Sequence, residues 1–271
     1  MSTETESAQA AKHGGKVPLI EFKHVGKRYG NIVALQDINL RVFAGEVTGV
    51  LGDNGAGKST LIKIMAGLHQ QTEGEVLVDG EPVHFSSPMD ALEKGIATVY
   101  QDLAVVALMP VWRNFYLGQE LYKNKFTRSL DVKTMRAVAR EELYKMGIDL
   151  PDVDAPIGSL SGGQRQCVAI ARAVYFGARA LILDEPTAAL GVKQSGMVLR
   201  YITAAKEHGF GVIFITHNPH HAHMVGDHFV LLNRGRQTLD CTYDELSLDD
   251  LTRQMAGGDE LDALSHELRG K

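Results

Sequence analysis

The run GDNGAGKST at residues 52–60 is the feature that most constrains this chain. It has the spacing of a phosphate-binding loop, or P-loop, and it lies between an apolar run at Glu46–Leu51 and an amphipathic stretch at Ser59–Ala66. Strand, loop and helix in that order are the context that supports the motif. A glycine turn with no ligand would have no need of a Lys followed by a Ser. We therefore predict an α/β protein that binds a nucleotide.

Each residue type in this loop suits phosphate chemistry. Glycines let the backbone wrap closely, so that N–H groups and a helix N-terminus face the anion. Lys58 is predicted to reach the β- and γ-phosphates of ATP, and the Ser59 hydroxyl to bind Mg²⁺. The predicted nucleotide contacts in the loop are Gly52, Asn54, Gly55, Gly57, Lys58, Ser59 and Thr60.

The remaining apolar pattern predicts the layout of the fold. Leu19–Val25 and Ala34–Phe43 alternate as half-buried antiparallel strands do, whereas Ala180–Leu183 and Gly211–Thr216 read as buried parallel strands. A helical pattern at Lys193–His208 separates the last two. The prediction is a parallel core sheet with an antiparallel β edge subdomain.

Helical patterning dominates residues 101–175, notably Leu130–Met146, and predicts an inserted α-helical subdomain. A turn is expected at Asn233–Arg236 and a short helix within Thr242–Met255. We place the ATPase domain at 17–248, after a disordered tail at 1–16 and before a C-terminal tail at 249–271. The first 16 residues lack the positive start and apolar stretch of a secretory signal.

Asp184 and Glu185 follow the apolar run 180–183, and His217 follows the run 212–216. Ligands of open α/β sheets bind at the carboxyl ends of the strands. Asp184 is expected to hold Mg²⁺ through water, and Glu185 to polarise the attacking water as general base. Two alternatives stay open. The carboxylate pair could cap the next helix, and the histidines at 217, 220, 221 and 223 could bind a metal, although no cysteine or acidic residue completes a set.

Composition excludes several classes of protein. No apolar stretch approaches the ~20 residues that a membrane-spanning helix needs. The net charge of -5, without a Lys/Arg-rich run, offers no footprint for nucleic acid. Two cysteines, Cys167 and Cys241, have no metal-site or disulfide spacing. Both are predicted to be reduced thiols.

The pentapeptide LSGGQ at 160–164 lies twenty residues before Asp184, and together with the P-loop it resembles the ATPase subunits of ABC (ATP-binding cassette) transporters. The resemblance runs from about Leu19 to Leu248 and implies a P-loop NTPase fold of the ABC type. It assigns Gln101 to Mg²⁺ contact and to sensing of the membrane partner, and His217 to the γ-phosphate. It also assigns stacking on adenine to Tyr29.

The same resemblance implies a head-to-tail pair of subunits. Ser161, Gly163 and Gln164 of one copy would grip the γ-phosphate on the P-loop of the other, so that a monomer cannot complete the site. The family usually carries an aspartate where this chain has Gly191. That departure leaves open a reduced rate of hydrolysis or a harmless variation.

Finer similarity favours one group within the family. The runs SPMDAL at 87–92, GIATVYQD at 95–102 and NFYLGQE at 114–120 resemble ATPases of ribose, galactose and fructose importers. THNPHH at 216–221 is most similar to the ATP-binding protein of bacterial fructose importers. Many members of this sugar group carry two fused ATPase domains, and this chain carries one, so a homodimer is expected.

The implied assembly is a peripheral ATPase on the cytoplasmic face of the inner membrane. It would bind two transmembrane permease subunits and be served indirectly by a periplasmic sugar-binding protein, with fructose as the predicted sugar. Three alternatives stay open: a soluble ABC-type ATPase of DNA repair or translation, an importer ATPase for another solute, and a regulatory domain that does not hydrolyse ATP. The first usually shows coiled-coil insertions, tandem cassettes or basic surfaces, which this chain lacks.

Overall fold

The computed structural model describes residues 15–124, 126–150 and 152–256. The predicted disordered tail at 1–16 lies almost wholly outside these residues. The strands are β1 (Ile20–Tyr29), β2 (Ile32–Val42), β3 (Val47–Leu51), β4 (Glu73–Val78), β5 (Glu81–Pro82), β6 (Ile96–Val99), β7 (Tyr122–Asn124), β8 (Ser129–Leu130), β9 (Ala180–Asp184), β10 (Gly211–Thr216), β11 (His228–Asn233) and β12 (Arg236–Thr242). The helices are α2 (Lys58–Met65), α3 (Pro88–Glu93), α4 (Val111–Phe115), α5 (Val132–Lys145), α6 (Gly162–Tyr175), α7 (Val192–Glu207), α8 (Pro219–Val225) and α9 (Leu248–Met255), with short 3₁₀ turns at Ile157–Ser159 and Tyr243–Glu245.

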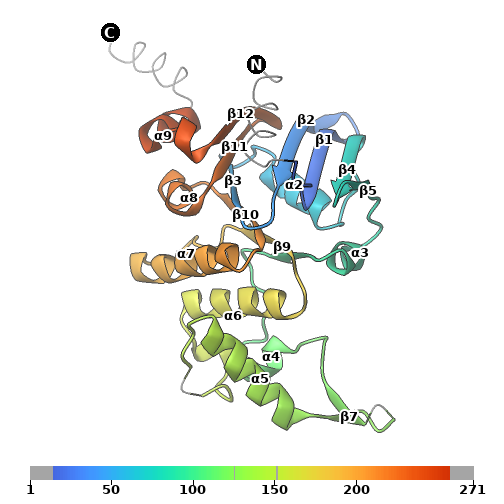
Figure 1. The fold of residues 1–271 in the computed structure, drawn as a ribbon, viewed down its shortest axis with the longest axis vertical. Helices are drawn as coiled ribbons and strands as arrows, with labels where there is room; N and C mark the ends of the chain where they lie inside the picture. The colour runs from blue at the N-terminus through green and yellow to red at the C-terminus, as the bar shows by residue number, and fades with distance from the viewer. Residues whose placement is uncertain (1–14, 125, 151, 257–271) are drawn as a thin grey trace.

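One curled sheet organises the molecule (Figure 1). Its strand order is β5-β4-β1-β2-β12-β11-β3-β10-β9-β6. The strands β11, β3, β10, β9 and β6 run parallel, whereas β5, β4, β1 and β2 pair in antiparallel fashion. The predicted parallel core sheet and antiparallel β edge are therefore confirmed. Within the sheet, β12 pairs with β2 through Arg236 and Gln36, which joins the two parts.

The parallel strands are buried on both faces, which explains their continuous apolar runs. Along β10, Val212 and Phe214 join a core with α6, α7 and α8, whereas Ile213 and Ile215 join a second core with α2 and the edge strands β1 and β2. Because side chains alternate along a strand, the sheet separates the two cores. Helices α2 and α6 consequently lie on opposite faces of the sheet.

The helical patterns are confirmed to within two residues at most ends. The stretches predicted at Ser59–Ala66, Leu130–Met146 and Lys193–His208 correspond to α2, α5 and α7. The turn predicted at Asn233–Arg236 joins β11 to β12 through Arg234 (φ 48°) and Gly235 (φ 77°), the positive φ pair that a tight hairpin favours.

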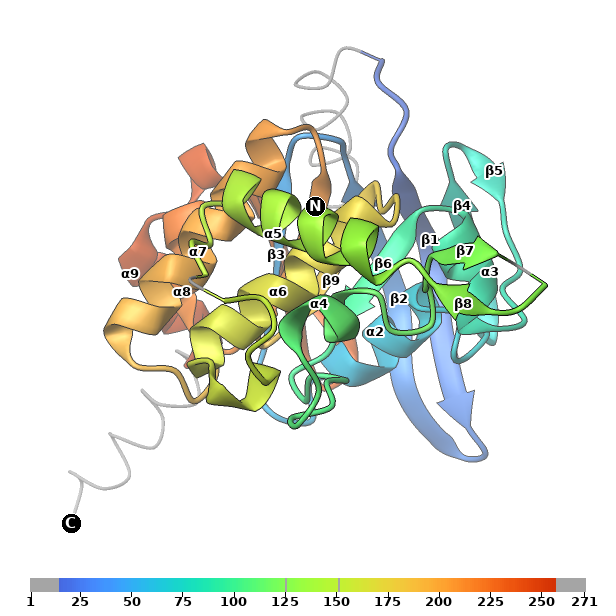
Figure 2. The same cartoon turned by 90° about the horizontal axis from the view of Figure 1, so that it is seen from below.

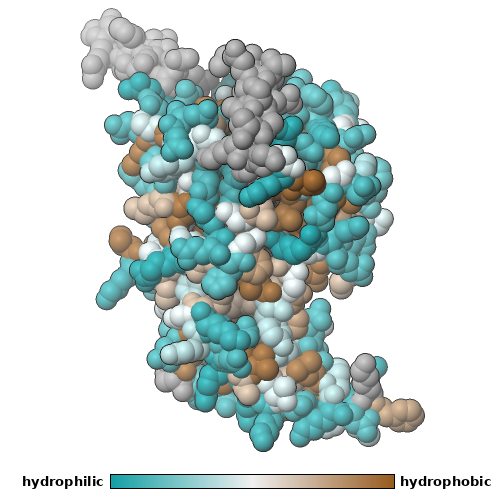
Figure 3. Space-filling view, in the orientation of Figure 1, coloured by the Kyte–Doolittle hydropathy of each residue, from teal (hydrophilic) through white to brown (hydrophobic). Residues whose placement is uncertain are grey.

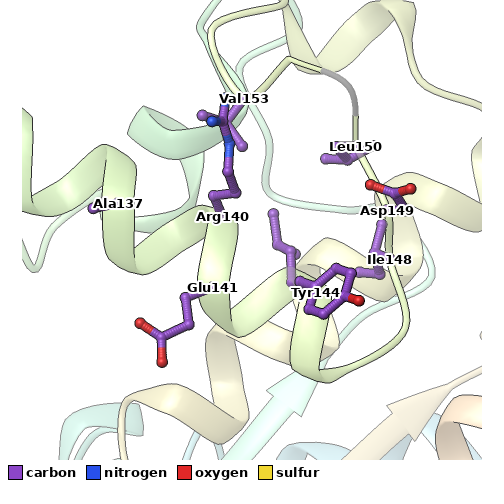
Figure 4. A pocket seen from close by; sticks show the side chains of 9 residues that line it. Ala137, Arg140, Glu141, Tyr144, Ile148, Asp149, Leu150 and Val153 are labelled. Atoms are coloured by element: carbon purple, nitrogen blue, oxygen red, sulfur yellow. The ribbon is translucent and has the colours of Figure 1, made fainter.

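Helices α4 and α5 form a lobe below the sheet, with α6 between this lobe and α7 (Figures 1 and 2). The lobe also holds a β7–β8 hairpin, although the sequence pattern indicated little strand character there. A small pocket in the lobe is lined by α5 side chains such as Arg140 and Tyr144, and by Ile148 and Leu150 beyond the helix (Figure 4). The described residues that line it belong to α5 and to the segment after α5, so the pocket is separate from the predicted site.

The C-terminal boundary needs a correction. The short helix predicted within Thr242–Met255 is present as α9, at residues 248–255, and its Leu251 is fully buried, so the tail that we placed from residue 249 does not start there. The helix packs against α8 and is capped by Ser247, whose hydroxyl accepts from the Asp250 N–H at 3.1 Å. The domain therefore extends to the end of α9.

The surface carries no long apolar band on the face seen in Figure 3, where hydrophilic residues predominate and hydrophobic residues form small separate groups. Within residues 15–256, leaving aside 125 and 151, none of the helices has both the length and the apolar character needed to cross a bilayer.

Both cysteine thiols are predicted to be unreactive in the folded protein. Cys167 is fully buried and Cys241 nearly so. Burial raises the pKa of Cys167 far above its usual value, and burial, Glu245 and Asp240 together raise the pKa of Cys241 to about 12. The thiolate is the nucleophile, so iodoacetamide at pH 8 should label neither cysteine in the folded chain and both after unfolding. Intact mass measures this, and label on the folded protein would contradict it.

Candidate nucleotide site at the carboxyl edge of the sheet

Four neighbouring parallel strands end at one edge of the sheet, and each end leads into a predicted site segment. Strand β3 leads into the P-loop, β10 into His217, β9 into Glu185 and β6 into Gln101. The register pairs Leu51 with Thr216, and Ile215 with Asp184. Residues 52 and 217, which are 165 positions apart in the chain, therefore meet at this edge of the sheet.

Two glycines of the P-loop cannot be replaced without moving the backbone. Gly52 has φ 148°, and a Cβ there would lie 2.4 Å from the Leu232 carbonyl oxygen. Gly57 has φ 108°, and a Cβ there would lie 2.7 Å from the Leu35 side chain. The loop is thus pressed against β11 on one side and β2 on the other. This close packing fixes the path of the loop around its concave side.

The first turn of α2 is open to an anion. Gly57 forms its N-cap without a side-chain hydrogen bond, and the turn contains no acidic residue. Helix α6, by contrast, is capped by its own Ser161. Uncapped N–H groups and the helix dipole together favour a negative ligand.

Lys58 adds a full positive charge at this place. It is 8% exposed, and its Nζ donates to the Gly52 and Asp53 carbonyl oxygens at 2.5 and 3.1 Å. These bonds hold the ammonium against the loop rather than in solvent. A phosphate seated on the loop would therefore meet backbone N–H groups and a buried cation together.

Asp184 lies half-buried at the end of β9. Burial raises the pKa of its carboxyl, the charge of Glu185 raises it further, and Lys58 opposes the shift. A nearby cation would stabilise the ionised form. Oxygen donors are the ligands that Mg²⁺ prefers, and Asp184 and the exposed Ser59 hydroxyl supply them. The residues present therefore fit the predicted ion.

Glu185 is held by two contacts from the neighbouring strand end. The Thr216 hydroxyl donates to its Oε2 at 3.2 Å, and His217 Nδ1 lies 2.9 Å from its Oε1. Its side chain is 11% exposed, whereas that of His217 is 59% exposed. The carboxylate is thus fixed in one orientation at the edge of the site. The alternative role as a helix cap finds no support, since α7 begins at Gly191 with no side-chain cap.

Gln101 lies in the exposed turn after β6. The pairing of Val99 with Leu183 brings this turn beside Asp184. Burial raises the pKa of Tyr100, a Thr98 hydrogen bond opposes the shift, and Asp184 adds to it. Tyr100 and Asp184 therefore share this edge. Gln101 stands directly after Tyr100 and is exposed, and its contact with Mg²⁺ stays a prediction.

Tyr29 lies at the end of β1, in the antiparallel part of the sheet, where it pairs with Ile32 of β2. Its ring is 39% exposed, makes an edge contact with His69 at 5.6 Å between centroids, and has Lys27 Nζ 5.1 Å from its own centroid. An exposed ring of this kind can stack on a base. Its assignment to adenine stays a prediction.

The LSGGQ segment is not brought to the P-loop. Ser161 and Gln164 close a capping box on α6, in which Ser161 Oγ accepts from the Gln164 N–H and Gln164 Oε1 accepts from the Ser161 N–H. Gly163 packs on α7, where a Cβ would lie 2.9 Å from the Met197 side chain. This box leaves the Ser161 O–H proton available to a ligand. The segment lies on the α6 side of the sheet, opposite α2.

The histidine cluster does not form a metal site. His221 Nδ1 lies 3.0 Å from the Thr187 hydroxyl, and His223 stacks on Phe229 at 6.0 Å between ring centroids. In the part of the chain that the structure describes, no three His, Cys, Asp or Glu side chains are grouped to hold a metal ion. Sequence reasoning missed the contacts of Thr216 and His221, since pairings between strand ends leave no local pattern.

Comparison with known proteins agrees with this geometry. A family model described as ABC transporter matches residues 35–188. The chain is 40% identical over 237 residues to a xylose/arabinose import ATP-binding protein of Sulfolobus acidocaldarius, covering 88% of this chain and 93% of that protein. It is 39% identical over 248 residues to a fructose import ATP-binding protein of Rhizobium meliloti, covering 90% and 95%. A solved ATP-binding cassette, dimeric in a post-hydrolysis state with ADP and phosphate, superposes with a TM-score of 0.69 at 27% identity, covering 83% of this chain and 98% of that one.

Proposed function

Since the chain belongs to the ABC transporter family of ATP-binding proteins, we propose that it hydrolyses ATP to drive import of a monosaccharide. The observation that carries the proposal is the meeting of the P-loop, Asp184 and Glu185 at one sheet edge. An anion cradle beside a fixed carboxylate suits in-line attack of water on the γ-phosphate, with catalysis mostly by positioning and charge.

Each residue of the site has a different role in the proposed reaction. The loop N–H groups and Lys58 bind and orient the phosphates, and Glu185 accepts a proton from the attacking water. Mg²⁺, held by Ser59, Asp184 and Gln101, would neutralise the negative charge on the phosphate oxygens. His217 orients Glu185 from 2.9 Å and faces the γ-phosphate. Tyr29 stacks on adenine.

The separation of α2 and α6 on opposite faces supports a dimer. Within one chain, Ser161, Gly163 and Gln164 stand at the start of α6, which packs on the face of the sheet opposite α2 and the P-loop. A second copy, placed head to tail, can supply them. Two such sites would close on ATP and open after hydrolysis.

A largely apolar groove beside Gln101 suits the membrane partner. It lies between the β6 end and α6 and is lined by Leu92, Leu103, Val168 and Phe176, with Asn114 and Arg172 as polar groups. Tyr100 also lines it. An amphipathic helix of a permease subunit would place its apolar face there, next to the turn that carries Gln101. This arrangement would hold the ATPase peripherally at the cytoplasmic face of the membrane.

Fructose remains our proposed sugar, and transport distinguishes it from its rivals. The complete complex, reconstituted in vesicles with its permease subunits and sugar-binding protein, should take up labelled fructose only with MgATP in the compartment that holds the ATPase. Preferential uptake of xylose or arabinose would contradict fructose as the sugar but would still support a role in sugar import. ATP hydrolysis that responds to none of the sugars would overturn both.

A further inference from the structure

The loop that follows β9 holds a strained backbone. Glu185 has φ 46° and Ala189 has φ 57°, both in the left-handed region that residues other than glycine rarely adopt. Such conformations are unfavourable for residues other than glycine and persist only where surrounding contacts determine them. The segment 185–189 therefore depends on its anchors.

The contacts of Glu185 hold only part of the segment 185–189. The Glu185 N–H donates to the Ile215 carbonyl at 2.9 Å, and its carboxylate contacts Thr216 and His217. These contacts fix the start of the segment. The middle of the segment is held at Thr187, which is 5% exposed.

The anchor at Thr187 is His221. Its Nδ1 lies 3.0 Å from the Thr187 Oγ1. The backbone of His221 is itself held in place, because the His221 N–H donates to Asn218 Oδ1 at 3.1 Å in the N-terminal cap of α8. Burial lowers the pKa of His221, as do the neighbouring His220 and His217, and a neutral ring can accept the Thr187 hydroxyl proton.

We propose that His221 is a positioning residue for hydrolysis, which holds the Glu185–Ala189 segment, and through it the Glu185 carboxylate, by its contact with Thr187. The inference rests on the proposed role of Glu185 as general base. The segment at 216–221 then contacts the Glu185–Ala189 segment at two residues: Thr216 and His217 contact Glu185, and His221 contacts Thr187. Loss of the second contact would let the strained backbone relax and move the carboxylate.

The test compares His221→Phe, which keeps a ring of similar size, with His221→Asn, whose side-chain amide can replace Nδ1. The full chain is assembled with its permease subunits, and phosphate release is measured together with ATP binding by calorimetry. His221→Phe should lower kcat about tenfold or more with ATP affinity unchanged, because small displacements of a catalytic group cost rate rather than binding. His221→Asn should recover most of the rate.

Thr187 gives an independent check. Thr187→Val removes the hydroxyl at nearly constant volume and should reproduce the loss of His221→Phe, and Thr187→Ser should not. The double variant His221→Phe/Thr187→Val should be no slower than either single variant, since both remove one contact. His220→Phe, an exposed neighbour, serves as the matched control and should turn over normally.

Failure of this inference differs from failure of the proposed function. Wild-type kcat in His221→Phe, or additive losses in the double variant, would overturn the positioning role. Turnover by Glu185→Gln, measured in parallel, would instead overturn the base on which it rests.

Discussion

Glu185→Gln is expected to lower the rate of ATP hydrolysis about 10²–10⁴-fold, the usual contribution of a general base. Glutamine keeps the shape of the side chain, and its Oε1 can still accept from the Thr216 hydroxyl, which lies 3.2 Å from the carboxylate. Only the basicity is lost. ATP binding, which depends on the P-loop, should be unchanged. The ATP-bound dimer should persist because its ATP is not hydrolysed.

Three measurements check this expectation: phosphate release, calorimetry with ATP, and light scattering with and without MgATP. Glu207→Gln is the matched control, since Glu207 is exposed at the end of α7, on the far end of that helix from the site loop. It should behave as wild type. Wild-type turnover by Glu185→Gln would remove Glu185 from the chemistry.

Local patterns in the sequence predicted most of the parts. The P-loop motif and the apolar runs of β3, β9 and β10 have short-range causes: glycine conformation, and strands buried on both faces. The stretch at Lys193–His208 is likewise periodic, and α7 follows it closely. Those features could be read without any knowledge of tertiary contacts.

Other parts depend on pairing across the chain. Strand β6 has only four residues, and it is a strand because it lies parallel to β9. The sequence predicted a short helix within Thr242–Met255, but α9 belongs to the domain because its Leu251 is buried and the helix packs against α8, which is a tertiary contact.

The residues of the site divide in the same way, into those that local patterns predict and those that depend on tertiary contacts. Asp184, Glu185 and His217 stand at ends of predicted strands, so the register of those strands brings them together. The role of His221 was not predicted, because its partner Thr187 lies 34 positions away and the contact requires the left-handed turn between Glu185 and Ala189. In the sequence, His221 contributed to the resemblance of the run 216–221 to fructose importers and was a candidate metal ligand among other histidines.

Ser161→Asp is expected to abolish hydrolysis while leaving the subunit folded and able to bind ATP. Aspartate caps a helix about as well as serine, so the N-terminus of α6 should keep its acceptor for the Gln164 N–H. It cannot donate a proton to a phosphate, and its charge would repel the triphosphate held by the other subunit at close range. Calorimetry should give normal ATP affinity, and phosphate release should be lost.

Mixing two inactive variants tests whether the site is shared. Lys58→Ala should lose ATP affinity, because the buried cation of the loop is removed, but it keeps an intact Ser161. Paired with a Ser161→Asp subunit, it completes one site from the two intact halves. An equimolar mixture should recover roughly a quarter of wild-type hydrolysis, since half of random pairs are mixed and each has one intact site of two.

The control for this mixture is Ser161→Asp combined with Lys58→Ala in a single chain, mixed with the Lys58→Ala subunit. No pair in that mixture contains an intact P-loop, so it should stay inactive under the same conditions. Recovery there would show that hydrolysis does not depend on Lys58, and normal turnover by Ser161→Asp alone would show that each chain hydrolyses ATP without the α6 face of another copy. The second result would contradict the proposed site, built from the α2 face of one copy and the α6 face of another, which the placement of these helices on opposite faces of the sheet supports.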